Sequence, residues 1–164
     1  MNKKPSSKYL VRFSDCDLFG HLNNARYIDY FLNAREDHLK EFYQLQLADF
    51  YKQGVAWVVG SHEISYLKPA VYNEEVIITS TLLQASENSL LVEMEMQNLE
   101  QTQIKALLWT TFIPVNPKTG KRENHPETFM HFATAIENQE EGIAGGHKAR
   151  TANRLALLKK AIAS

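Results

Sequence analysis

The sequence predicts an α+β fold, and three observations lead to this class. Residues 24–42 carry apolar side chains at three- and four-residue spacing, the period of a helix. Four segments with strand-like patterns follow this helix, and short polar stretches suited to hairpin turns connect the last three. One more strand candidate precedes the helix. A strand, a buried helix and then a series of strands is an α+β order.

The first half of the chain supplies the first strand and the helices. Residues 9–13 alternate apolar and polar side chains and predict the strand. The helix over residues 24–42 has a wide apolar face, so we expect other structure to wrap most of it. Its main stripe consists of Tyr27, Phe31, Ala34, His38 and Phe42. Asn23 or Asn24 is the expected N-cap, because an Asn side chain can accept a hydrogen bond from a nearby backbone N–H. Residues 46–53 predict a second, short helical segment.

The later strands are expected at residues 55–67, 75–83, 90–98 and 104–115. The third of them alternates most clearly, with valine and methionine on one face and glutamate and glutamine on the other. In the first of them, strict alternation puts Glu63 on the same face as Trp57 and puts His62 on the opposite face.

The C-terminal part of the chain has a different character. We expect one domain over residues 1–135, then a linker and a basic helix within residues 136–164. Residues 137–146 are acidic and then glycine-rich, which favours an exposed segment, whereas residues 147–164 carry five positive charges and no acidic residue. The apolar stripe of this helix consists of Leu155, Leu158 and Ile162. We expect this stripe to pack on the sheet or on a partner subunit; an anionic surface, a carrier protein or partial fraying are the alternatives.

Composition narrows the function classes. The 164 residues are 44% apolar, enough for a core, and 18 basic residues nearly balance 19 acidic ones. This balance gives no reason to expect nucleic acid as a partner. Cys16 is the single cysteine, which favours a reducing compartment. We expect no secretory signal and no membrane span, because no apolar run is long enough, and the expected location is therefore the cytoplasm.

Residues 12–31 hold the densest group of chemically useful side chains. Asp15 and Asp17 end an extended stretch, a turn at Gly20 and His21 follows, and an Asn pair then begins the aromatic-rich helix. The pattern predicts that a carboxylate, an imidazole and the free N–H groups of a helix start lie close together. These are the groups that hydrolysis of an activated carbonyl needs.

This segment resembles the signature of hotdog-fold acyl-CoA thioesterases of the 4-hydroxybenzoyl-CoA thioesterase type, Asp-x-Asp-x-x-Gly-His-x-Asn-Asn-x-x-Tyr. The resemblance implies a curved antiparallel sheet wrapped around a long central helix. It implies hydrolysis of an acyl-CoA or acyl-carrier-protein thioester, with no metal or redox cofactor. It also implies a site built between two subunits, so a homodimer or a dimer of dimers is expected.

The resemblance assigns roles to residues of the motif. Asp17 matches the catalytic carboxylate, which acts as nucleophile or general base, and Asn24 matches the helix position whose backbone N–H faces the thioester carbonyl. His21 is expected to assist by orienting Asp17, holding a water or donating to the carbonyl. Plant acyl-carrier-protein thioesterases have Asp-x-Asn-x-His at this spacing; here Phe19 replaces that Asn, which weakens the case for their network.

Several further residues are candidates for the site. The expected substrate-binding residues are Asn23, Gly20, Tyr27 and Glu63, although Asn23 also suits ordinary capping and Glu63 an ion pair on its strand. Asp15 is expected to hold the loop or to pair with Arg12 or Arg26. Cys16 is a poor nucleophile, because the acids on either side of it raise a thiol pKa. Candidates for coenzyme A phosphates are Lys118, Lys121 and Arg122.

Three other functions remain open from the sequence. One is a non-catalytic protein that binds acyl-CoA and regulates another process. The second is a dehydratase or hydratase of the same fold, which would need an acid or histidine on the central helix. The third is a thioesterase specific for acyl-carrier protein, with the basic C-terminal helix as the docking surface.

Overall fold

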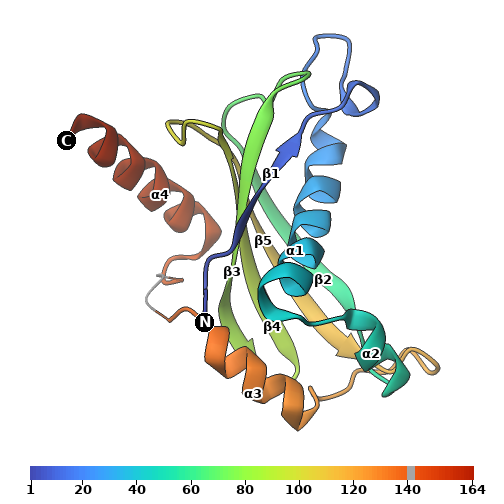
Figure 1. Cartoon of the computed structure of the whole chain (residues 1–164). Coiled ribbons are helices and arrows are strands. Elements are labelled where there is room, and N and C mark those ends of the chain that lie inside the picture. Colours follow the sequence, from blue (N-terminus) through green and yellow to red (C-terminus); the bar gives the residue numbers. More distant parts are fainter. Residues whose placement is uncertain (140–142) are drawn as a thin grey trace.

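The computed structural model describes residues 1–139 and 143–164. A five-stranded antiparallel sheet in the order β1-β3-β4-β5-β2 wraps around the long helix α1 (Figure 1). The strands are β1 (Ser6–Leu10), β2 (Ala56–Tyr66), β3 (Glu75–Ser86), β4 (Ser89–Asn98) and β5 (Ile104–Val115). The helices are α1 (Tyr27–Tyr43), α2 (Leu47–Lys52), α3 (Glu127–Ile136) and α4 (Gly146–Ala163), with 3-10 turns η1 (Phe13–Asp15) and η2 (Asn24–Arg26). The predicted α+β fold is confirmed.

The core lies between α1 and the inner face of the sheet. Tyr27, Phe31, Ala34 and His38 are buried at the spacing that the sequence predicts, whereas Phe42 at the end of the stripe is 37% exposed. The sheet contributes buried side chains from its three central strands, including Ile78, Met94, Met96 and Leu108. Helix α1 therefore packs along the sheet from one end of the molecule to the other, and this packing holds its first turn in place.

The first strand differs from its prediction. It covers Ser6–Leu10, three residues earlier than residues 9–13, and pairs with β3 from Ser6 opposite Thr79 to Leu10 opposite Glu75. Val11 is fully buried, but the chain then turns into η1, where the Asp15 N–H donates to the Arg12 carbonyl at 3.1 Å. The predicted strand ends three residues beyond the observed one, because the turn that ends β1 leaves no mark in the apolar pattern.

A bulge at Gly60 changes which side chains of β2 share a face. Val59 lies opposite Phe112 and Ser61 opposite Thr111, so one residue of β2 is unpaired. A Cβ atom at Gly60 would lie 2.6 Å from Ile113 Cδ1, so a larger residue there would require the end of that side chain to move. Beyond the bulge the alternation is shifted. The prediction for β2 was therefore wrong: His62 shares the inner face with Trp57, and Glu63 lies on the outer face.

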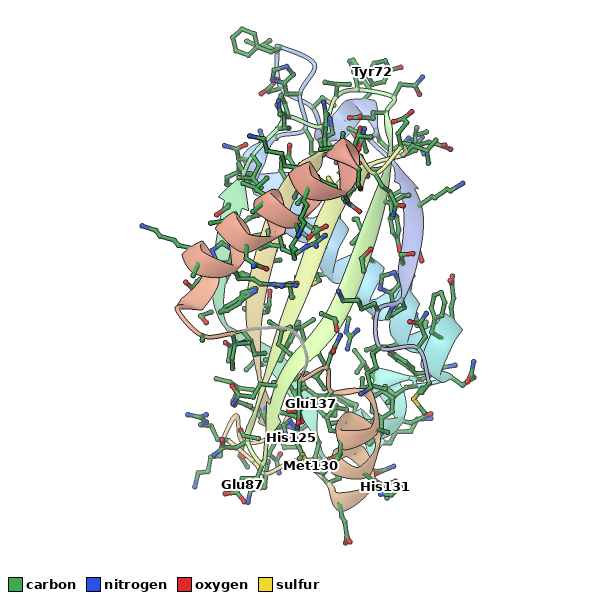
Figure 2. The ribbon with its side chains drawn as sticks, turned by 90° about the vertical axis from the view of Figure 1, so that its left-hand side faces the viewer. Tyr72, Glu87, His125, Met130, His131 and Glu137 are labelled. Carbon is green, nitrogen blue, oxygen red and sulfur yellow. The ribbon has the colours of Figure 1, made fainter. Side chains whose placement is uncertain are left out.

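Helix α4 covers the outer face of the sheet and crosses it obliquely (Figure 2). Arg150 forms two hydrogen bonds of 2.8 Å to the Glu93 carboxylate, and Arg154 pairs with Glu95 at 2.8 and 3.0 Å. The predicted polar face of β4 is therefore correct, but it is buried under the helix. The stripe was expected to pack on the sheet or on a partner subunit. It does not pack on the sheet, since Leu155 is 40% and Ile162 55% exposed and polar residues make the contact, and packing on a partner subunit stays a prediction.

Helix α3 was not predicted. It follows Pro126 and buries Phe129, Ala133 and Ile136 against one end of the core. These residues have four- and three-residue spacing, so a helical signal was present, but the prolines before it were read only as the end of the sheet. No helix within the described residues is long and apolar enough to span a membrane.

Candidate active site

The loop between η1 and η2 is closed by its own backbone around Asp17. The Asp17 N–H donates to the His21 carbonyl at 2.8 Å, and the Gly20 N–H donates to the Asp17 carbonyl at 3.1 Å. Gly20 has a φ of +73°, a conformation that other residues adopt only with strain. Its place in the site is therefore set by the turn that it allows. The loop lies at the end of the molecule where α1 begins (Figure 1).

The two carboxylate oxygens of Asp17 have different surroundings. Oδ1 accepts hydrogen bonds from the backbone N–H groups of Phe19 at 2.9 Å and His21 at 3.1 Å. Within the described residues, Oδ2 has no hydrogen-bond or ion-pair partner. One oxygen thus holds the loop and fixes the side chain, while the other remains available to a ligand.

Asp17 lines a surface pocket of about 230 Å³ at the start of α1. The pocket is lined by Asp17, His21, Leu22, Asn24, Tyr27, Tyr66, Leu67, Lys68 and Pro69. All three predicted catalytic residues, Asp17, His21 and Asn24, are therefore brought to one pocket. Of the predicted substrate-binding residues, Tyr27 lines it as well, whereas Gly20 and Asn23 lie beside lining residues in the loop before η2 and do not line it themselves.

His21 contacts Asp17 through its backbone. Its N–H donates to Asp17 Oδ1, whereas its imidazole makes no hydrogen bond within the described residues. The ring lies beside Phe19, with the ring centres 6.4 Å apart. The imidazole is therefore open to a ligand or a water, and the backbone N–H holds the carboxylate.

The helix start provides a free backbone donor. Asn23, one of the two expected caps, caps η2, the 3-10 turn that leads into α1: its Oδ1 accepts from the Ala25 N–H at 3.0 Å. In the described part of the chain, the Asn24 N–H has no acceptor, and the Asn24 carbonyl accepts from the Tyr66 hydroxyl at 2.9 Å. A free N–H at the positive end of a helix can stabilise a developing oxyanion.

Tyr27 and Tyr66 form one wall of the pocket. The rings meet edge to face with their centres 5.2 Å apart. The Tyr27 hydroxyl accepts from the Ala70 N–H at 3.0 Å, and burial is the main cause that raises the pKa of Tyr27. Tyr27 is therefore a fixed, protonated wall residue.

Asp15 has a structural partner other than the predicted arginines. The Tyr30 hydroxyl donates to Asp15 Oδ2 at 2.6 Å, and burial followed by this bond raises the pKa of Tyr30 to about 12. Arg26 pairs with Asp29 instead. Burial and then the charges of Asp15 and Asp17 raise the pKa of Cys16, so the thiol is protonated and a poor nucleophile, as expected.

Several candidates lie away from the pocket. Glu63 is exposed on the outer face of β2, because of the bulge, and does not line the pocket. The segment after β5, which holds Lys118, Lys121 and Arg122, lies at the opposite end of the sheet from the loop before α1 (Figure 1). Lys68 was not among the expected residues but lines the pocket. Among the described residues, no group of three His, Cys, Asp or Glu side chains is arranged to hold a metal ion.

Fold and pocket together define a hotdog thioesterase. A model of the thioesterase-like superfamily matches residues 11–133, and the chain belongs to this superfamily. It is 32% identical over 111 residues to the long-chain acyl-CoA thioesterase FadM of Escherichia coli (strain K12), over 68% of this chain and 83% of that protein. It is 26% identical over 132 residues to the 1,4-dihydroxy-2-naphthoyl-CoA hydrolase of Rippkaea orientalis, over 79% of this chain and 95% of that one.

Solved structures agree with this family. The DHNA-CoA thioesterase from Staphylococcus aureus superposes with a TM-score of 0.73 at 22% identity, covering 80% of this chain and 89% of that chain. This likeness confirms the hotdog fold. The resemblance drawn from the motif is confirmed at the level of family, and with it the predicted class of enzyme, a thioester hydrolase.

Proposed function

We propose that the protein hydrolyses an acyl-CoA thioester to a carboxylic acid and coenzyme A, with Asp17 as the catalytic carboxylate. One observation carries the proposal: the unpartnered Oδ2 of Asp17 and the unpartnered N–H of Asn24 belong to residues that line the same pocket. The first can act on the thioester carbon or on a water, and the second can bind the carbonyl oxygen.

In the general-base route, Asp17 Oδ2 takes a proton from a water whose oxygen attacks the thioester carbon. The Asn24 N–H stabilises the negative charge on the former carbonyl oxygen. The carbon–sulfur bond then breaks, and the thiolate takes the proton from Asp17. Donors fixed by the fold contribute most when they point to the charge that develops in the transition state, and the packing of α1 fixes Asn24.

In the nucleophilic route, Asp17 attacks the carbon itself and displaces the thiolate, and water then cleaves the mixed anhydride. A single turnover in H₂¹⁸O can separate the two routes. In the nucleophilic route, water that attacks the Asp17 carbon of the anhydride puts the label into Asp17 and none into the released acid. In the general-base route, the label appears in the acid and Asp17 stays unlabelled.

We further propose that the active form is at least a homodimer in the cytoplasm. Asp17 is exposed in a single chain, so one subunit leaves the pocket open. Among the described residues, strand β2 is at the edge of the sheet and pairs only with β5, and its eleven residues offer the other edge to a second copy. A second subunit that closes the pocket would exclude water and strengthen the electrostatic contacts with the substrate.

Basic residues near the pocket and on α4 bear on whether coenzyme A or acyl-carrier protein carries the acyl group. Lys68 is exposed at the pocket and can attract phosphate groups of coenzyme A. Docking of acyl-carrier protein through the basic part of α4 is the alternative, but Arg150 and Arg154 are engaged with β4. The proposal therefore favours coenzyme A thioesters.

A substrate panel tests the proposal. Purified protein is assayed for release of free thiol from short, long and aryl acyl-CoA thioesters and from acyl-carrier-protein thioesters. We expect turnover of at least one coenzyme A thioester and a lower kcat/KM for the carrier-protein form. Binding of acyl-CoA without turnover would favour the non-catalytic regulatory protein instead.

A further inference from the structure

A second cavity lies inside the domain, between α1, the inner face of the sheet, α2 and α3. Its volume is about 270 Å³, and leucine, phenylalanine and other apolar side chains form most of its wall. Two charged residues also line it, Arg35 and Glu36. Glu36 is exposed and pairs with Lys40, whereas Arg35 is only 7% exposed. We call this space the Arg35 cavity.

Arg35 is a buried cation with few partners. One guanidinium nitrogen donates to Ser80 Oγ at 2.9 Å, and the guanidinium carbon lies 6.0 Å from the centre of the Tyr43 ring. In residues 1–139 and 143–164, no carboxylate forms an ion pair with it. A guanidinium remains charged in proteins, and its burial without an anion is costly. The fold thus holds an uncompensated positive charge beside an apolar cavity.

Neighbouring groups add further donors, and the two nearby carboxylates are engaged elsewhere, Glu36 with Lys40 and Asp37 with the Tyr9 hydroxyl. His38 Nδ1 lies 2.7 Å from Ser80 Oγ, and because Ser80 accepts from Arg35, its own proton can go to Nδ1. That assignment puts the His38 proton on Nε2, a buried atom without a partner. Trp57, which lines the cavity, also has a buried N–H without a partner in the part of the chain that the structure describes. These buried donors therefore have no acceptor among the described residues.

The Arg35 cavity lies deeper along α1 than the Asp17 pocket. Arg35 comes eleven residues after Asn24, which corresponds to about 16 Å along a helix. On β2, Trp57 lines the cavity and Tyr66 lines the Asp17 pocket, and both face α1. His125, which stacks on Trp57, lies at the opposite end of the molecule from Tyr72, whose N–H donates to the Gly20 carbonyl of the Asp17 loop at 2.8 Å (Figure 2). A ligand that reached both places would need a long chain.

We propose that the Arg35 cavity binds an apolar chain that ends in a carboxylate, with the carboxylate on Arg35. The apolar wall contacts the chain, and the Arg35 guanidinium donates charge-assisted hydrogen bonds to the carboxylate. The carboxylate can come from two sources: the far end of a dicarboxylic acyl thioester whose other end lies at Asp17, or a free fatty acid. The first source rests on the proposed function; the second does not.

Calorimetric titration with octanoate and with 1-octanol tests the site. The measurements use both the natural protein and its Asp17→Asn variant, so that catalysis plays no part. We expect octanoate to bind at least about tenfold more tightly than the alcohol, because a charge-assisted hydrogen bond replaces a neutral one. Arg35→Met should abolish this preference, and Lys52→Met, which removes an exposed cation of α2, should leave it intact.

Equal binding of acid and alcohol to the natural protein would overturn the proposal, and this comparison needs no folded variant. A preference that survives in a folded Arg35→Met protein would overturn it as well. The second arm compares the KM of the dodecanedioyl-CoA monothioester with that of dodecanoyl-CoA. A KM at least tenfold lower for the dicarboxylic form would show that the carboxylate on Arg35 belongs to the substrate. Equal KM values, together with binding of octanoate through Arg35, would show that it belongs to a free fatty acid. Failure of both thioesters to react would count against the proposed function alone.

Discussion

The hydroxyl of Tyr66 donates a hydrogen bond of 2.9 Å to the backbone carbonyl of Asn24. This bond joins the last residue of β2 to the first residue of η2, whose N–H is the proposed oxyanion donor. Tyr66 is half exposed and its ring also contacts Tyr27. Tyr66 therefore acts as a positioning residue: the sheet holds the helix start in place through one side chain.

Removal of the Tyr66 hydroxyl tests this relationship. For Tyr66→Phe we expect kcat to fall about threefold to tenfold with little change in KM, because the donor geometry loosens by the loss of one hydrogen bond. Steady-state kinetics measure both constants. Tyr72→Phe is the matched control, since Tyr72 is exposed and its hydroxyl makes no hydrogen bond among the described residues. An unchanged kcat in Tyr66→Phe would remove the positioning role.

Replacement of His21 should have a smaller effect than replacement of Asp17. In His21→Ala, the backbone N–H that holds Asp17 Oδ1 remains, and only an imidazole without a protein partner is lost. We expect kcat/KM to fall less than about tenfold, at the low end of what one assisting group contributes. His131→Ala on the exposed face of α3 serves as control. A loss as large as that of Asp17→Asn would give the imidazole a primary role.

The ion pair between Arg150 and Glu93 should govern the attachment of α4. Its side chains are 4% and 5% exposed, so Arg150→Met leaves a buried carboxylate with only the Trp109 N–H as a described partner. We expect the free energy of unfolding in urea to fall by about 3–5 kcal/mol. Arg154→Met should cost less, because the Arg154 side chain is 23% exposed.

A double replacement checks the cause. With Arg150→Met and Glu93→Leu together, no charge is left unpaired, and most of the stability should return. A single Arg150→Met protein as stable as the natural one would show that the pair does not hold the helix.

Stability should decrease in mild acid because of His38. Burial, and then the charge of Arg35, lowers the pKa of His38 to about 4. The unfolded chain, with an ordinary histidine pKa of about 6.5, therefore binds a proton that the folded protein excludes. This contribution to stability is present above pH 6.5 and is lost as the pH falls toward 4, by about 2 kcal/mol between pH 8 and pH 5.

Urea unfolding at a series of pH values measures this dependence. His38→Asn keeps an acceptor for the Ser80 hydroxyl and has no titrating ring, so its stability should depend less on pH over that range. His131→Asn should keep the full dependence. Equal slopes for His38→Asn and the natural protein would contradict the assignment to His38.

The sequence was most informative where the motif is local. The turn at Gly20, the cap at Asn23 and the helix start at Asn24 lie within a few residues of one another, and their contacts are made by neighbouring backbone groups. Such contacts follow from residue type and spacing, so the pocket residues Asp17, His21 and Asn24 could be predicted together.

Features that depend on long-range contacts were missed. Glu63 was placed on the wrong face because one unpaired residue at Gly60 shifts the alternation, and only the register with β5 reveals it. Asp15 accepts a hydrogen bond from the Tyr30 hydroxyl, because the first turn of α1 places Tyr30 beside the loop. Arg35 was not selected, because the absence of a buried counter-ion can be seen only after the chain has folded.

Turnover by Asp17→Asn is the most direct test of the central claim. The Asn side chain keeps an oxygen that can accept from Phe19 and His21, so the loop, the melting temperature and the oligomeric state should be unchanged. We expect kcat for the best acyl-CoA substrate to fall by about 10²–10⁴-fold, the usual contribution of a general base. Asp49→Asn on α2, which is exposed, should retain full activity. Activity of Asp17→Asn within a factor of two of the natural protein would contradict the account.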